Sequence, residues 1–154
     1  MAILPVVLDT CVIYPPILRD TLFRATESGL FQLRLSDEII NELIRNYQKR
    51  EGIDQQKLAR LESQIREAFP DFANPPPSLI TCMTNQEKDR HVLASAVLSG
   101  AKVLVTKNIK DFPPSSVVPY GIEVQNPDEF LVHLYHLDQT EMIQIIWDCQ
   151  VPNN

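Results

Sequence analysis

Short apolar runs alternate along the chain with stretches in which apolar residues recur every three or four positions. The first run, residues 3–8, is continuous and rich in β-branched side chains, which is typical of a strand buried on both faces of a parallel sheet. Similar runs predict strands at residues 31–35, 102–105 and 122–124. Residues 79–82, which follow three consecutive prolines, are expected to form a short extended piece.

Helical spacing of the apolar residues predicts helices between and after these strands. One is expected to begin after Ser36, a good N-cap that two acids follow, and another to end at Gly100. Strands that alternate with helices imply βαβ units around a mainly parallel sheet, within one domain over residues 1–154. The predicted helices are residues 17–28, 37–47, 54–69, 86–99, 128–137 and 139–149, the first with Ile17, Leu18, Leu22 and Ala25 in its apolar stripe.

The composition is that of a soluble globular protein, with 154 residues, 44% of them hydrophobic, and a net charge of −6. A chain of this length buries roughly 68–70% of its unfolded surface, which is enough for a core. The acidity argues at first against a nucleic-acid partner. However, residues 1–113 hold 14 basic and 14 acidic side chains, whereas residues 114–154 hold six acids and no Lys or Arg. The net charge therefore constrains the C-terminal surface and says little about the substrate.

Glycine and cysteine usage excludes several classes of protein. With four glycines the chain has neither a G-x-G-x-x-G motif nor a P-loop, so a site that cradles nucleotide phosphates is not expected. Cys11, Cys82 and Cys149 are odd in number and far apart, which excludes a disulfide framework and favours a reducing cytoplasm. The N-terminal run MAILPVVLDT is short and lacks a basic start, so we expect neither a signal peptide nor a membrane span.

Three acids stand where predicted strands end or helices begin. Asp9 directly follows the first buried strand, so it should point into the crevice at the carboxyl edge of the sheet. Glu42 flanks the apolar stripe of its helix, and Asp89 precedes the inward residues of another. Taken singly, each also fits an ordinary structural role. Asp9 could cap the turn after its strand, Glu42 could be a solvated helix carboxylate, and Asp89 could be an N-cap.

The segment V-L-V-T-K-N-I-K-D-F-P adds a second polar cluster after a buried strand. Thr106, Asn108 and Asp111 lie in the loop that follows this strand. Two strand ends and two helix starts thus offer hard oxygen ligands, which suit Mg²⁺ or Mn²⁺ better than zinc. Metal-assisted hydrolysis of a phosphodiester is the chemistry that such a cluster most naturally serves.

Four segments of the chain together resemble the PIN-domain ribonucleases, a family that includes the VapC-type toxins. The segments occur in the family's order over residues 3–135, and the third is the most specific. They read VVLDTCV, LSDEIINEL, DRHVLASAVLSGAKVLVTKNIKDFP and GIEVQNPDEFL. The resemblance implies a three-layer α/β/α fold around a mainly parallel sheet.

The resemblance also implies a metal site. Asp9, Glu42 and Asp89 match the family's three best-defined acids, with Mg²⁺ as the cofactor and Mn²⁺ as a substitute. Many members carry T-x-D where this chain has T-K-N, so an amide, Asn108, stands at the fourth position. Asp111, three residues further on, is the other candidate for the fourth ligand.

The activity implied by the resemblance is a Mg²⁺-dependent endoribonuclease that is the toxin of a toxin–antitoxin pair. It would act on single-stranded or structured RNA in the cytoplasm. His91 is expected on a helix face rather than as a catalytic base, because the mechanism does not require one. Five residues are expected to contact the RNA: Thr10, Thr106, Arg90, Lys107 and Lys110. The two threonines could instead orient the acids. The three basic residues could instead be ordinary solvated charges of a loop.

Other functions stay open. The amide at position 108 motivates a catalytically weak PIN-like module that binds RNA or protein. A phosphatase of the haloacid dehalogenase type needs a second Asp two residues after Asp9, where this chain has Cys11. The last two predicted helices favour a homodimer or an antitoxin-binding face, with docking onto the core as the alternative. Their apolar residues include Leu131, Leu134, Met142, Ile145, Ile146 and Trp147, and His133 and His136 are expected at the surface or an interface rather than on a metal.

Overall fold

Four parallel strands form one sheet in the order β2-β1-β3-β4. The structure, a computed structural model, describes residues 3–150, so the predicted domain of residues 1–154 extends beyond the described part at both ends. In the register of the sheet, Val6 of β1 lies beside Leu33 of β2 and Val103 of β3. The strands are β1 (Pro5–Leu8), β2 (Gln32–Arg34), β3 (Val103–Val105) and β4 (Glu123–Gln125).

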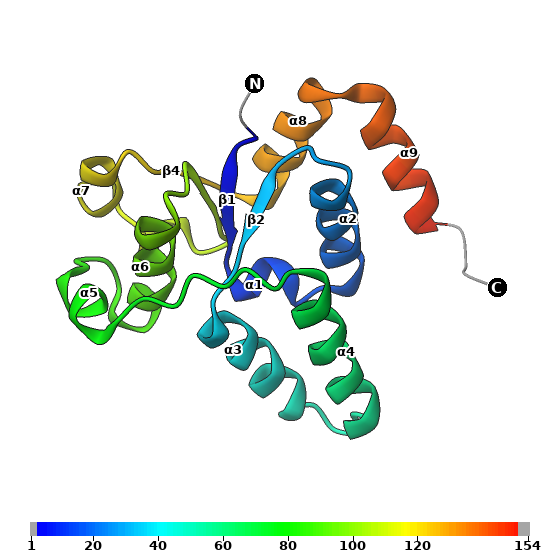
Figure 1. Cartoon of the computed structure of the whole chain (residues 1–154), viewed down its shortest axis with the longest axis horizontal. Coiled ribbons are helices and arrows are strands. Elements are labelled where there is room, and N and C mark those ends of the chain that lie inside the picture. Colours follow the sequence, from blue (N-terminus) through cyan, green and yellow to red (C-terminus); the bar gives the residue numbers. More distant parts are fainter. Residues whose placement is uncertain (1–2, 151–154) are drawn as a thin grey trace.

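Helices cover both faces of this sheet, as Figure 1 shows. On one face, α6 (Arg90–Ser99) packs against β1, β2 and β3. The other face is covered by α2 (Pro16–Glu27) and α8 (Pro127–Leu137), and α9 (Gln139–Gln150) packs on these two helices. Burial on both faces explains why β1 and β3 are continuous apolar runs rather than alternating ones. The predicted α/β class and three-layer arrangement are confirmed.

A helical hairpin extends beyond the carboxyl ends of the strands. The short helix α1 (Thr10–Ile13) follows β1 at once, and α3 (Asp37–Gln48) packs against it and against α4 (Gln55–Ala68). The side chain of Ser36 accepts a hydrogen bond from the backbone N–H of Ile39 at 3.2 Å, so the predicted N-cap of α3 is confirmed. Because α3 begins at this edge of the sheet, it carries its polar face toward the end of β1.

Three predictions of local structure were wrong in detail. The piece after the prolines is a helix, α5 (Pro77–Cys82), because proline with its fixed φ is favoured in a first helical turn. The helix predicted from residue 86 begins as a 3₁₀ turn, η1 (Glu87–Asp89), before α6. Ile17 is 76% exposed, since α2 buries Thr21, Leu22 and Ala25 instead. The remaining elements are η2 (Ile109–Asp111), α7 (Pro114–Val117) and η3 (Val118–Tyr120).

The two C-terminal helices are only partly absorbed by the core. Leu134, Met142 and Ile145 are buried, whereas Ile146 is 44% and Trp147 64% exposed. Docking therefore accounts for part of their apolar character. Within residues 3–150, none of the helices has both the length and the apolar character that a membrane crossing needs.

Replacing the N-cap serine, Ser36→Ala, is expected to lower the free energy of unfolding by about 0.5–2 kcal/mol, because a buried cap of α3 is lost. Urea unfolding followed by circular dichroism measures the change. Ser115→Ala, at an exposed serine of α7, is the matched control and should change stability by less than about 0.5 kcal/mol. Equal effects of the two substitutions would contradict the role assigned to the cap.

Candidate active site

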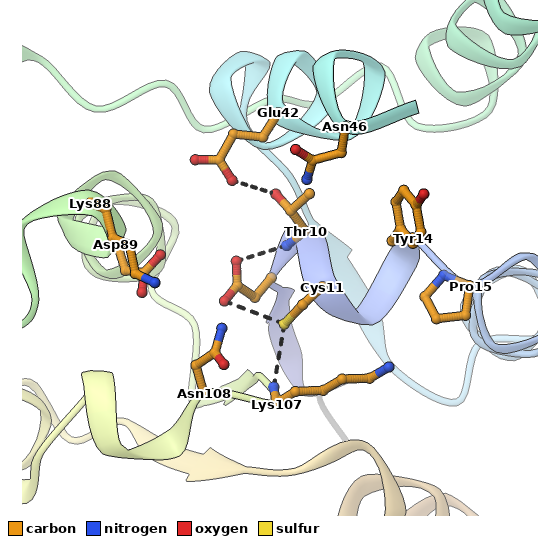
Figure 2. A pocket seen from close by; sticks show the side chains of 11 residues that line it. Thr10, Cys11, Tyr14, Pro15, Glu42, Asn46, Lys88, Asp89, Lys107 and Asn108 are labelled. Atoms are coloured by element: carbon orange, nitrogen blue, oxygen red, sulfur yellow. Dashed lines mark hydrogen bonds between the residues drawn. The ribbon is translucent and has the colours of Figure 1, made fainter. Parts of the chain in front are cut away.

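A cleft of about 580 Å³ opens where β1 and β3 end. Its floor is formed by residues that directly follow β1, and its walls come from α3 on one side and from η1 and the loop after β3 on the other (Figure 2). The predicted acids Asp9, Glu42 and Asp89 all line it, although they are up to 80 residues apart in the chain. The full lining is Asp9, Thr10, Cys11, Tyr14, Pro15, Glu42, Asn46, Lys88, Asp89, Lys107 and Asn108.

Asp9 is the most buried of the three acids, with 3% of its surface exposed. Its carboxylate accepts hydrogen bonds from the backbone N–H of Thr10 at 2.7 Å and from the hydroxyl of Thr106 at 2.9 Å. Burial raises the pKa of Asp9, because these two hydrogen bonds only partly offset the loss of water around the charge. Thr10 and Thr106 thus both donate hydrogen bonds to the carboxylate of Asp9.

Asp89 faces the same cleft from the start of α6. Asp89 occupies the N-cap position of α6, as the structural alternative predicted, but its side chain makes no capping hydrogen bond there. Its Oδ2 receives no hydrogen bond from residues 3–150. Burial, the negative charge of Asp9 and a hydrogen bond shared with the Asp111 carboxyl raise the pKa of Asp89 to about 6.

Glu42 lies on α3 in a different environment. Its Oε2 accepts a hydrogen bond from the hydroxyl of Thr10 at 2.9 Å, and its Oε1 lies 2.6 Å from Nε2 of His91. Burial would raise the pKa of Glu42, but the hydrogen bond and charge of His91 outweigh it and hold that pKa below its ordinary value. With only 26% of its side chain exposed, Glu42 is not a solvated helix carboxylate.

His91 is the residue whose place the sequence did not reveal. It was expected on a helix face, whereas the structure turns it toward Glu42 from the first turn of α6. Burial would lower the pKa of His91, but the Glu42 carboxylate outweighs burial and raises it. Each of the two side chains therefore favours the charged form of the other.

The two candidates for the fourth ligand occupy different places. Asn108 lines the cleft, as Asp9 and Asp89 do. Asp111 lies outside the lining, beside Asp89, with its Oδ2 3.7 Å from Nζ of Lys88. Asn108 thus borders the cleft directly, whereas Asp111 contacts two residues that line the cleft, Asp89 and Lys88.

The expected RNA contacts are only partly brought together. Lys107 lines the cleft, whereas the Arg90 guanidinium donates to the backbone oxygen of Asn85 at 3.0 Å and Lys110 borders a separate apolar hollow. Sequence reasoning missed Lys88, Tyr14 and Asn46, which also line the cleft. Tyr14 and Asn46 each lie four residues after a predicted site residue, Thr10 and Glu42, so helical spacing was the signal that could have found them.

The donor set fits Mg²⁺ better than zinc. Among residues 3–150, no three His, Cys, Asp or Glu side chains are already spaced as a closed set of metal ligands. Mg²⁺ keeps several of its waters and uses only one or two carboxylates directly, so it does not need such a set. Asp9 and Asp89 are buried carboxyls with raised pKa values, and one oxygen of Asp89 accepts no hydrogen bond from the described residues. A hard cation bound here would stabilise the charged forms of both.

At pH 7.5 without divalent ions, Asp89→Asn is expected to raise the free energy of unfolding by on the order of 1–3 kcal/mol. The pKa of Asp89 lies near 6 in the fold against an ordinary 3.8, so its proton stabilises the fold below pH 3.8 and that stabilisation is lost as the pH rises through 6. The substitution should also flatten the pH dependence in this window. Urea unfolding in chelator measures both effects, with the exposed Asp71→Asn as control. A variant less stable than the wild type at pH 7.5 would be inconsistent with this picture.

Two comparisons with known proteins bear on the family of this chain. The sequence model of the PIN domain family matches residues 5–110, which include Asp9, Glu42 and Asp89. The Mycobacterium tuberculosis protein VapC50, whose name gives it provisionally as a ribonuclease, is 47% identical over 66 residues. That match covers 43% of this chain and 36% of VapC50, so it spans about a third of the relative's length. Because the family match extends over most of the chain, the protein belongs to the PIN domain family.

Proposed function

We propose that the protein is a Mg²⁺-dependent endoribonuclease that hydrolyses RNA phosphodiester bonds. The observation that carries the proposal is the convergence of Asp9 and Asp89, both buried and both with raised pKa values, on one open cleft. Buried carboxyls are costly unless a cation or a proton neutralises them. In a metal-dependent phosphodiester nuclease, the cation that neutralises such carboxylates is also the one that promotes hydrolysis.

Asp9 and Asp89 are the principal ligands in this proposal, and Mn²⁺ would substitute for Mg²⁺. When bound, the ion lowers the pKa of a water and offsets the charge that develops on the phosphate. Glu42, ionised through its contact with His91, holds the ion or orients the attacking water. Thr10 links the two walls of the cleft, since its backbone N–H binds Asp9 and its hydroxyl binds Glu42.

Asn108 is the better candidate for a direct fourth contact, because it lines the cleft and Asp111 does not. Asp111 would then act on Asp89, beside which it lies, either as a further ligand or by fixing the position of that carboxyl. Lys88 and Lys107 line the cleft and would contact phosphates. Arg90 and Lys110 would contact RNA further from the scissile bond.

The biological role proposed is that of a toxin in a toxin–antitoxin pair, acting on RNA in the cytoplasm. Its support is the family and the 47% identity to VapC50 within 66 residues. The partly exposed apolar side chains of α8 and α9 support a face for a second copy or for an antitoxin. A catalytically weak binding module remains the alternative, which the amide at position 108 favours.

Asp9→Asn is expected to abolish Mg²⁺-dependent cleavage of a single-stranded RNA while the fold is retained. The amide keeps the size of the side chain and removes the charge that binds the ion, so a loss of at least about 100-fold is expected. Gel assays with end-labelled RNA measure the rate, chelator should abolish it in the wild type, and Asp71→Asn is the control at an exposed acid. Cleavage by Asp9→Asn at the wild-type rate would refute the assignment, and RNA binding by a wild type that never cleaves would favour the binding module.

The fourth position is tested by comparing Asn108→Ala with Asp111→Asn in the same assay. A direct contact from Asn108 predicts a loss of about 10- to 100-fold in Asn108→Ala, together with a higher Mg²⁺ concentration for half-maximal rate. Asp111→Asn keeps a hydrogen-bonding group beside Asp89 and should cost less. A larger loss in Asp111→Asn would move the fourth ligand to that residue.

A further inference from the structure

The end of the cleft away from Asp89 is aromatic rather than acidic. Tyr14 and Pro15 line it, and Asn46 lies between Tyr14 and Glu42 in Figure 2. None of these three residues has a part in the hydrolysis described above. They continue the same cleft, so a chain bound at the acids would run past them.

The Tyr14 ring is held in place before any ligand arrives. It stacks on the ring of Tyr47, with centroids 4.5 Å apart and planes at 19°. Tyr47 is 6% exposed, and its hydroxyl donates a hydrogen bond to the backbone oxygen of Tyr14. Arg19 donates to that same hydroxyl at 3.0 Å, and its guanidinium carbon lies 5.8 Å from the centre of the Tyr47 ring. The stack is therefore a rigid platform, which a ligand can use with little loss of side-chain entropy.

Two polar groups accompany this platform. Asn46 is exposed, and no hydrogen bond within residues 3–150 uses its carboxamide. Lys107, which comes from the opposite wall of the cleft, extends its side chain toward the Pro15 side in Figure 2. An aromatic face, an unused amide and a free-standing ammonium thus border the same end of the cleft.

We propose that this end of the cleft is a subsite for one unpaired nucleobase of the RNA, stacked on Tyr14. Asn46 hydrogen-bonds the edge of the base, and Lys107 contacts an adjacent phosphate. Aromatic side chains bind unpaired bases in this way, whereas a base inside a duplex has no free face to offer. The subsite rests on the proposed nuclease function, and it adds that the nucleotide beside the scissile bond must be single-stranded.

The test is a double-mutant cycle between the protein and its RNA. In a short RNA that the wild type cleaves, each nucleotide near the cleaved bond is replaced in turn by an abasic one. Loss of a single stacked base is expected to lower kcat/KM by about 5- to 150-fold at one position. Tyr14→Ala should show a similar loss on the intact RNA and no further loss on that abasic RNA, whereas Tyr14→Phe keeps the platform and should stay near the wild type. Additive losses at every position would overturn the subsite.

A control variant, a substitute variant and a separate binding measurement keep the outcome interpretable. Tyr120→Ala removes an exposed tyrosine of η3 that does not line the cleft, and it is the matched control. Tyr14→Leu replaces Tyr14→Ala should the latter not fold. Binding is followed separately in chelator with an RNA that carries 2-aminopurine, whose fluorescence is quenched by stacking. Quenching by the wild type that Tyr14→Ala abolishes supports the subsite, even for a protein that cleaves no RNA, in which case only the proposed nuclease function fails. Equal quenching by both proteins overturns the subsite.

Discussion

The burial of a carboxylate at the end of the central strand is the constraint on which the rest of the site depends. The backbone N–H of Asp9 continues the sheet by donating to the oxygen of Val105 at 3.0 Å, which fixes the backbone of Asp9 beside the end of β3. In that position it is almost entirely removed from water. Thr10 and Thr106 reduce the cost of this burial without neutralising the charge. A cleft organised around such a group favours a cation, and a cation there can serve phosphodiester chemistry.

The three acids are separated by their environments into two kinds. Burial raises the pKa of both Asp9 and Asp89, and a like charge adds to the effect, that of Glu42 for Asp9 and that of Asp9 for Asp89. Glu42 has His91 as a partner, and its pKa is lowered. A bound metal ion would stabilise the charged forms of Asp9 and Asp89, whereas Glu42 is ionised without one. This division suits a site in which two carboxylates hold the ion and a third, always charged, orients what the ion activates.

The sequence was sufficient where one segment determines the outcome. The apolar run of residues 3–8 predicted a strand buried on both faces, and Val6–Leu8 are fully buried in β1. Ser36 was a strong N-cap, and Asp9, which directly follows β1, lies in the cleft at the carboxyl edge of the sheet. It was insufficient where two distant segments decide. The contact between His91 and Glu42 spans 49 residues, and the Tyr14 platform needs Tyr47 behind it. The prolines before α5 did not distinguish a helix from an extended piece, because proline is common both in extended segments and in the first turn of a helix.

The central claim is that holding Asp9 and Asp89 together in the cleft destabilises the fold, and that a bound divalent cation removes this destabilisation. The most direct measurement is the thermal midpoint of unfolding of the metal-free wild type at pH 7.5 as Mg²⁺ is added, at constant ionic strength. Binding to the folded state alone predicts a rise in that midpoint which grows with the logarithm of Mg²⁺ concentration above Kd and is absent from Asp9→Asn. A midpoint that does not change up to about 10 mM Mg²⁺, well into the range where weak protein sites for hard cations fill, would contradict the claim.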